Sequence, residues 1–293
     1  MTVCLAAICD NGQSVVIASD RMITSNYWMV EFEHPSITKI KRLSNSCLAM
    51  TAGDALAHTE LFSLVNDQIG ALSNPTVEQV VETIKVSYQQ MRQKRIVERV
   101  LAPRAFPDIA TFYQHQRTLV EYVALSIQNE IDQFLYGLEI LVAGLSADRA
   151  HIYAVLDPGT SQCWDFVNFH AIGFGGTHAI SALIGREAHQ GMSYLDGTMA
   201  VLDAKRIAER APGVGPSTDI AIIRRDGNIA VSQDNIAKII EINDIWRRRE
   251  VSWEQKLREF FENKSDDLKA DKSMSKVVMA GKEQENDEKG TAP

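Results

Sequence analysis

The chain has 293 residues, of which 45% are hydrophobic and 23% are charged, and its formal net charge is −8 at pH 7. This composition is typical of a globular protein, and the length allows one large domain or two ordinary ones. The negative charge argues against a general nucleic-acid binder. No apolar stretch approaches the length of a membrane span, so no membrane partner is expected.

The first apolar run is too short for a signal peptide, because Asp10 and Asn11 interrupt it. The cytoplasm is therefore the expected compartment. The four cysteines are Cys4, Cys9, Cys47 and Cys163, and they form neither a CxxC pair nor a zinc-type spacing with histidine. Three of them lie in apolar, strand-like runs, so we expect buried free thiols there.

Strand patterns open the chain. Residues 2–9 (TVCLAAIC) and 14–19 (SVVIAS) flank an Asn-Gly pair, which is the strongest short hairpin pattern. A second pair of strands is predicted at 38–43 (TKIKRL) and 47–52 (CLAMTA). The later strands are predicted at 139–146, 150–157 and 162–169, and a last hairpin is predicted over TDIAIIRR and NIAVS, on either side of Asp226-Gly227.

Helical periodicity separates the strand blocks. It runs from Ala57 to Leu72, resumes after Ser73-Asn74-Pro75-Thr76, and returns over 118–135, while 92–117 is basic, less regular and interrupted by prolines. The Gly-rich turn GFGG (173–176) precedes a helix expected at 177–188, and another is expected at 196–210. Residues 234–262 are predicted to be helical, and 264–293 to be disordered.

Hairpin strands imply antiparallel sheets, and helices placed between the strand blocks can cover their outer faces. The order of elements fits an α+β fold, specifically a four-layer α-β-β-α sandwich of two antiparallel sheets. An α+β domain with one sheet fits the periodicity about as well.

Common catalytic motifs are absent: the sequence has no GxSxG, HExxH or P-loop. A threonine behind the initiator methionine offers another chemistry. An N-terminal threonine can act as a nucleophile with its own α-amine, of ordinary pKa about 8, as the base. Asp20 ends the second strand, Lys39 begins another, and Gly53 closes the strand that contains Thr51. A lysine near Thr2 would favour ionisation of the hydroxyl, a carboxylate would orient that lysine, and a glycine N–H could face an oxyanion.

Three stretches in this order, TVCLAAICDNGQSVVIASD, TKIKRL and CLAMTAGDALA, resemble proteasome β-type subunits and their bacterial relative HslV. EILVAGLSADRAHIYAVLDPG, AIGFGGTHA and TDIAIIRRDGNI extend the resemblance over about residues 2–235. It implies the N-terminal nucleophile hydrolase fold and a threonine-type peptidase. It assigns Thr2 as the nucleophile after removal of Met1, and makes Asp20, Lys39 and Gly53 its catalytic partners. Thr51 maps to the pocket for a substrate side chain.

The resemblance has two local departures. Phe174 stands where family members often carry a serine, and Ala211 and Val214 stand where an aspartate and a serine orient the terminal amine. Ser217 is the nearest polar replacement in that region. Taken alone, Phe174 is predicted to pack in the core.

The expected domain organisation is a hydrolase domain over 1–240 with an extra helical segment at 92–117, a helical extension at 241–263 and the tail at 264–293. The resemblance implies a ring of identical or homologous subunits, a peptide or unfolded-protein substrate and an ATP-dependent unfoldase as a partner. The mechanism needs no metal or organic cofactor. Two alternatives stay open: a non-catalytic structural subunit of such a ring, and an amidohydrolase of the same fold that acts on a small amide.

Overall fold

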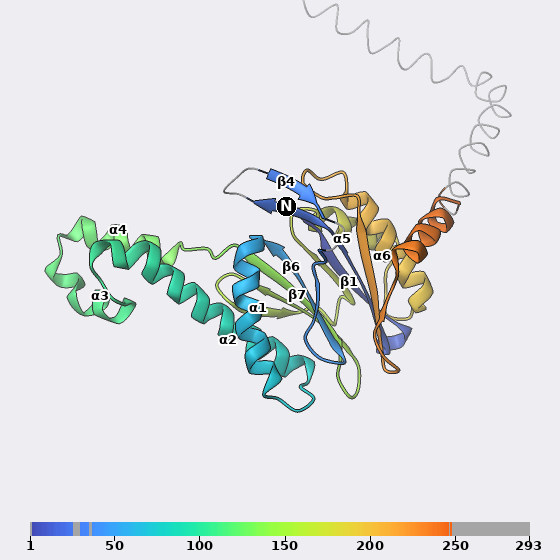
Figure 1. Ribbon diagram of the computed structural model, residues 1–293, viewed down its shortest axis with the longest axis horizontal. Helices are drawn as coiled ribbons and strands as arrows, with labels where there is room; N and C mark the ends of the chain where they lie inside the picture. Colours follow the sequence, from blue (N-terminus) through green and yellow to red (C-terminus); the bar gives the residue numbers. More distant parts are fainter. Residues whose placement is uncertain (1, 26–29, 35–36, 246, 248–293) are drawn as a thin grey trace, which may run out of the picture. The chain divides into compact units, whose positions relative to one another are not determined.

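The computed structural model describes residues 2–25, 30–34, 37–245 and 247. The chain divides into two units, residues 1–240 and 241–293, and the first unit contains both of the larger sheets. Within the described residues, its framework consists of two larger antiparallel sheets, a short hairpin and helices (Figure 1).

The first sheet is built around the N-terminal hairpin. Its strands in spatial order are β10 (Phe169–Ile172), β1 (Cys4–Cys9), β2 (Ser14–Asp20), β11 (Thr218–Arg224) and β12 (Ile229–Ala230). The predicted Asn-Gly hairpin between β1 and β2 is confirmed. Asp10, Asn11 and Gly12 all have positive φ angles in the turn, the conformation that asparagine and glycine tolerate best.

The second sheet contains the remaining long strands. In spatial order they are β5 (Ile40–Arg42), β6 (Cys47–Gly53), β7 (Leu138–Leu145), β8 (Ala150–Leu156) and β9 (Thr160–Cys163). The prediction of one strand over 162–169 is wrong. Here β9 ends at Cys163 and β10 begins at Phe169, because Asp165 accepts the Ile152 N–H and Asn168 has a φ of 70°, which together form a turn.

A short hairpin that the sequence analysis missed, β3 (Met22–Ser25) and β4 (Val30–Glu33), follows β2 directly. Its two strands pair only with each other among the described residues, and Met22 lies opposite Glu33. This hairpin brings the Glu33 carboxylate to the loop that precedes β11, where it accepts hydrogen bonds from Ser217.

Alternate residues of β1 enter different hydrophobic cores. Cys4, Ala6 and Ile8 face the second sheet, whereas Leu5 and Ala7 face a helical layer. Both faces of β1 are therefore buried, which explains why its sequence is continuously apolar instead of alternating with polar residues. The core between the sheets also contains Met50 and Leu141 from β6 and β7 and Ile17 and Ile223 from the first sheet; all of these side chains are buried.

Helices cover the outer face of each sheet (Figure 1). α5 (Gly176–Gly185) and α6 (Tyr194–Ala208) pack on the first sheet, with Leu183 and Val201 in the shared core. α1 (Ala55–Gly70) and α2 (Val77–Ile96) pack on the second, with Leu61 and Tyr88 buried against it. Residues 233–240 are also helical, and Ile236 joins the core under α6. The result is an α+β arrangement in which the two sheets face each other between helices.

The segment 92–117, whose pattern is less regular and which was expected to form an extra helical segment, is largely helical. α2 continues through its basic residues to Ile96 and passes into a π-helical turn at Val97–Leu101. α3 (Ile109–His115) and α4 (Glu121–Asp132) complete a helical arm with its own small core, centred on Phe112 and lying beyond the sheets (Figure 1). The capping box of α2, in which Thr76 and Gln79 exchange hydrogen bonds, matches the predicted start of that helix.

The remaining predictions concern the C-terminal residues and the cysteines. Residues 241–245 and 247 of the second unit are helical, and the prediction of disorder for 264–293 falls outside the described residues. Cys4, Cys9 and Cys47 are buried and free, as predicted, whereas Cys163 is exposed. No helix in the described part of the chain is long and apolar enough to cross a membrane.

Candidate functional site

The N-terminal hairpin places Thr2 and Asp20 at the same end of the first sheet. Cys4 pairs with Ser19, so the residue before β1 and the last residue of β2 are neighbours. Asp20 also lies opposite Thr218, at the start of β11. Both side chains are withdrawn from solvent, since Thr2 is 3% exposed and Asp20 is fully buried.

Asp20 is the shared hydrogen-bond acceptor of the site. The Thr2 hydroxyl donates to Oδ1 of Asp20, which also accepts the Val3 N–H at 3.0 Å and the Lys39 ammonium at 2.7 Å. The other oxygen, Oδ2, accepts the N–H groups of Met22 and Gly215, each at 3.1 Å. A buried carboxylate needs such partners, because an unpaired buried charge is strongly unfavourable.

Lys39 supplies the positive charge of the site. It directly precedes β5, and its side chain is 11% exposed. The pattern that singled it out was a lysine at the start of an otherwise strand-like run, and the structure brings its ammonium to Asp20. Thr2, Asp20 and Lys39, which the resemblance assigns to one site, meet through one carboxylate oxygen.

Thr51 and Gly53 lie on β6, in the sheet that faces β1. Thr51 is 4% exposed, and its carbonyl accepts the Cys4 thiol at 3.5 Å, which holds the end of β6 against β1. Gly53 pairs with Leu138 and has a φ of +111°. A Cβ there would overlap the Gly137 carbonyl, so only glycine fits. The described hydrogen bonds of Thr2 do not include Gly53, whose oxyanion role stays a prediction.

The Gly-rich turn closes over the Thr2 backbone. The Gly175 N–H donates to the Thr2 carbonyl at 3.1 Å. A Cβ at Gly173 would lie 2.5 Å from that same carbonyl oxygen, and the φ of Gly173 is +84°. The Gly173 N–H donates to Oε2 of Glu139 at 2.7 Å. Phe174 is 58% exposed, so the prediction that it packs in the core is wrong: the turn directs it toward solvent while its flanking glycines contact Thr2.

Sequence reasoning missed two groups beside the site, Glu139 and the Gly215 amide. Glu139 had a visible signature, since it is a lone charge near the start of the apolar strand LEILVAGL. Gly215 had none, because its role depends on how the loop before β11 folds back onto Asp20. Ala211 and Val214, which replace polar residues of the resembling family, are 3% and 7% exposed and belong to the core under α6. Ser217 binds Glu33.

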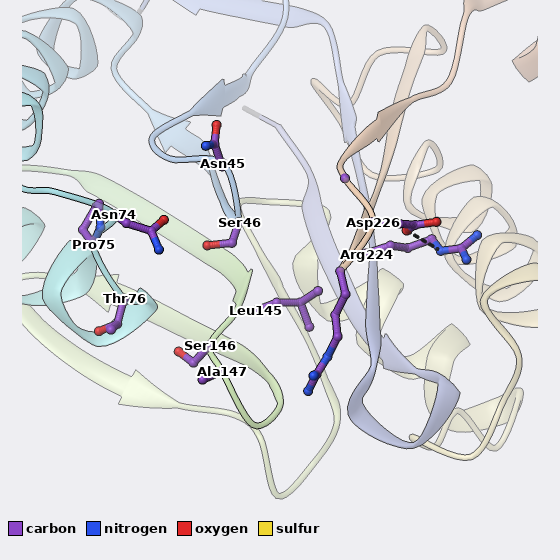
Figure 2. Close-up of a pocket in the computed structure, with 12 residues that line it drawn as sticks. Asn45, Ser46, Asn74, Pro75, Thr76, Leu145, Ser146, Ala147, Arg224 and Asp226 are labelled. Atoms are coloured by element: carbon purple, nitrogen blue, oxygen red, sulfur yellow. Dashed lines mark ion pairs between the residues drawn. The ribbon is translucent and has the colours of Figure 1, made fainter.

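A separate cavity of about 490 Å³ lies at the other end of the sheets (Figure 2). It is bordered by the start of β6 and the ends of β7 and β11, whereas Gly53 and Thr218 mark the opposite ends of β6 and β11. In Figure 2 the Arg224 side chain turns toward Asp226, to which it is ion-paired at 3.2 Å. This cavity is therefore not part of the Thr2 site. Within the described residues, no group of three or more His, Cys, Asp and Glu side chains is placed to hold a metal ion.

No protein-family model matches this chain, and a search of curated proteins finds no match. The geometry around Asp20 and the resemblance of the motifs are therefore what indicate a function for this chain.

Proposed function

We propose that this chain is a threonine-type peptidase subunit of the proteasome β-type class, with Thr2 as its nucleophile once Met1 has been removed. The observation that carries the proposal is the shared acceptor Asp20 Oδ1, which receives both the Thr2 hydroxyl and the Lys39 ammonium. A lysine held beside a hydroxyl by a buried carboxylate favours the ionised form of that hydroxyl.

The arrangement of layers supports the finer fold assignment, which is the N-terminal nucleophile hydrolase fold. Two antiparallel sheets face each other, helices cover the outer face of each, and Thr2 lies two residues before β1, an inner strand of one sheet. The position of Thr2 between β1 and the Gly-rich turn gives its backbone a fixed direction. A fixed nucleophile is what an acyl-transfer site requires.

The proposed reaction uses only groups of this chain and water. The Thr2 α-amine, freed by loss of Met1, takes the hydroxyl proton as Oγ1 bonds to the substrate carbonyl carbon. The Lys39 ammonium stabilises the developing alkoxide, and the Gly53 N–H is assigned to the carbonyl oxygen that becomes negative. The C–N bond then breaks and its nitrogen receives the proton from the amine. Water attacks the resulting ester with the same amine as base, which releases the acid and restores the hydroxyl.

A second candidate is a non-catalytic subunit that keeps the fold and contributes to a ring. The observation that favours it is the loss of polar groups around the terminal amine, since Phe174 points to solvent and Ala211 and Val214 are apolar and buried. The Glu139 carboxylate, which accepts the N–H of Gly173, is a charged group beside the turn that contacts Thr2. Both candidates share the ring of subunits and the unfoldase partner implied by the resemblance, whereas the peptide or unfolded-protein substrate belongs to the peptidase alone.

Mass spectrometry separates the two candidates. The purified chain is weighed intact to determine whether Met1 is absent, then treated with an epoxyketone, which reacts with both the hydroxyl and the free amine of an N-terminal threonine. We expect one adduct mapped to Thr2, no adduct in Thr2→Ala, and retained reaction in Thr2→Ser. Cleavage of a panel of fluorogenic peptides and small amides then identifies the substrate class. A chain that lacks Met1 but gives neither adduct nor cleavage favours the non-catalytic subunit.

A further inference from the structure

Lys205, on α6, is a fully buried lysine that the proposed mechanism does not use. Its ammonium lies 2.8 Å from each of three acceptors in the described structure: the Gly215 carbonyl, the Pro216 carbonyl and Oε1 of Glu209. An ammonium has three N–H donors and no acceptor, so this cradle satisfies the charged form completely. Burial lowers the pKa of Lys205, and the nearby carboxylates of Glu209, Asp20 and Glu33 oppose that effect.

The two carbonyls that bind Lys205 belong to the loop that completes the Asp20 site. Gly215 uses its N–H for Oδ2 of Asp20, at 3.1 Å, and its carbonyl for Lys205. The loop is also attached to β4, because Ser217 donates hydrogen bonds from its backbone N–H and its hydroxyl to Glu33. A Cβ on Gly215 would overlap the Glu33 carboxylate, so the loop and this carboxylate approach each other closely.

We propose that Lys205 is a positioning residue for the Thr2 site: it holds the 215–216 loop so that the Gly215 N–H binds the Asp20 carboxylate, and it adds a second cation behind that carboxylate. This inference rests on the proposed function, because it assigns Lys205 a role in that reaction. Lys205 acts through Gly215 and Asp20 and does not touch Thr2. The charged groups that face it are Glu209 at the C-cap of its own helix, Asp20 at the end of β2 and Glu33 on β4.

The position of Gly215 matters for Asp20 because the two carboxylate oxygens bind different groups. Oδ1 is occupied by Thr2, Val3 and Lys39, whereas Oδ2 is held by Met22 and Gly215. Hydrogen bonds to Oδ2 set the rotation of the carboxyl group and hence the direction in which Oδ1 accepts. If the loop loses its anchor, the Thr2 hydroxyl and the Lys39 ammonium lose a common, fixed acceptor.

The test compares Lys205→Met, which removes the ammonium, with Lys205→Gln, which retains two N–H donors without the charge. Lys85→Met is the matched control, since Lys85 lies on α2 and pairs with Glu82. In Lys205→Met we expect hydrogen exchange of the Gly215 amide to become about tenfold faster, and reaction of Thr2 with an epoxyketone about tenfold slower. Lys205→Gln should give intermediate values, and Lys85→Met should match the wild type.

The pH–rate profile distinguishes an electrostatic effect of Lys205 on the site from a general loss of rigidity in the variant. Removing a cation near the site makes neighbouring groups bind protons more tightly, so the acidic limb of the Lys205→Met profile should move to higher pH. A folded Lys205→Met variant with unchanged Gly215 exchange and an unmoved limb overturns the proposal, even if its rate is lower. If the wild-type chain does not react at all, the proposed function fails, whereas Gly215 exchange still decides the role of Lys205.

A second measurement covers the case in which Lys205→Met does not fold. Lys205→Gln is then used for Gly215 exchange and for the pH profile, with the same criteria. In the wild-type chain, labelled with nitrogen-15 in its lysines, the Lys205 ammonium resonance should shift when Thr2 is acylated, while that of Lys85 should not. A Lys205 resonance that stays unchanged on acylation contradicts the coupling.

Discussion

Lys39 and Asp20 form an ion pair of 2.7 Å between an 11% exposed side chain and a fully buried one. The same Asp20 oxygen accepts the Thr2 hydroxyl, so the pair is part of the proposed chemistry as well as of the fold. Because the pair is shielded from water, neither charge has solvent as a substitute partner. Removing either one therefore affects stability and reactivity together, and the two effects have to be measured separately.

On the proposed function, replacing Lys39 with methionine should abolish most of the activity while leaving a folded chain. We expect a loss of at least about 100-fold in the rate of Thr2 acylation, because no cation then stabilises the alkoxide. The uncompensated Asp20 carboxylate should lower the free energy of unfolding by about 3 kcal/mol. Acylation rates and urea unfolding of the same samples check both values. Lys41→Met is the control for a general loss of positive charge, and an equal rate loss in that variant would contradict a specific Lys39–Asp20 pair.

Replacing Gly173 with alanine should displace Thr2. The new Cβ would lie 2.5 Å from the Thr2 carbonyl oxygen and 2.8 Å from its Cγ2, at a φ of +84°. We expect a loss of stability of about 2 kcal/mol and a fall in Thr2 acylation of at least about tenfold. Gly70→Ala is the matched control, because it ends a helix and nothing lies within 4 Å of its Cβ position. Thermal unfolding and the rate of Thr2 acylation are measured for both variants. Equal stability and equal acylation rates in the two would contradict close packing at Gly173.

His170 should make the fold sensitive to acid. It is 8% exposed and stacks on Trp164 with ring centroids 3.8 Å apart, and burial lowers its pKa to about 4. An unfolded histidine has a pKa of about 6.5, so between these values the unfolded chain takes up a proton that the folded chain does not. The contribution of neutral His170 is therefore complete above pH 6.5 and declines as the pH falls toward 4.

In numbers, the free energy of unfolding of the wild type should fall by about 3 kcal/mol more than that of His170→Phe between pH 7.5 and pH 4. Phenylalanine keeps a ring on Trp164 without a titrating group. Chemical denaturation at several pH values gives both curves, and His189→Gln, at an exposed position, serves as the control. Parallel curves for the wild type and His170→Phe would show that His170 is solvated.

Thiol alkylation should distinguish the exposed cysteine from the three buried ones. Burial raises the pKa of Cys9 and of Cys47 to about 12 and also raises that of Cys4, whereas Cys163 is exposed. We expect iodoacetamide to label only Cys163 in the native chain at pH 8, slowly because partial burial raises its pKa as well. Intact mass gives the number of labels, and Cys163→Ser should remain unlabelled until denaturant is added. Labelling of Cys4 in the native chain would contradict close packing of β1 on β6.

Local patterns were sufficient for the parts of this fold that neighbouring residues specify. The β1–β2 hairpin follows from the Asn-Gly turn, and the start of α2 from Thr76, since each depends on contacts within a few residues. The β3–β4 hairpin was missed because four-residue strands show too little alternation. The course of 162–169 was misread because Asp165, a residue in the middle of the run, forms its bonds to β8.

The residues of the candidate site also divide into those predicted from local patterns and those that only tertiary contacts define. Thr2, Asp20 and Lys39 were predicted as candidates from their places at strand ends, and their meeting is a tertiary fact that no local pattern contains. Gly215 and Lys205 could not be predicted, because the loop between α6 and β11 acquires its role only by folding onto β2. Phe174 was assigned to the core on hydrophobicity alone. In the structure its neighbours Gly173 and Gly175 pack against Thr2, and the Phe174 side chain is exposed to solvent.

The donors around Asp20 come from separate parts of the chain: the N-terminal residues Thr2 and Val3, the start of β3, the residue before β5, and the loop before β11. No fragment that ends before residue 215 can assemble this set. During synthesis, Thr2 is made before the other residues of this set, and its surroundings are complete only after more than two hundred further residues have followed. On the proposed function, a chain in which this loop has not yet folded onto β2 lacks part of the set that activates Thr2, so the nucleophile should become reactive only with the complete fold.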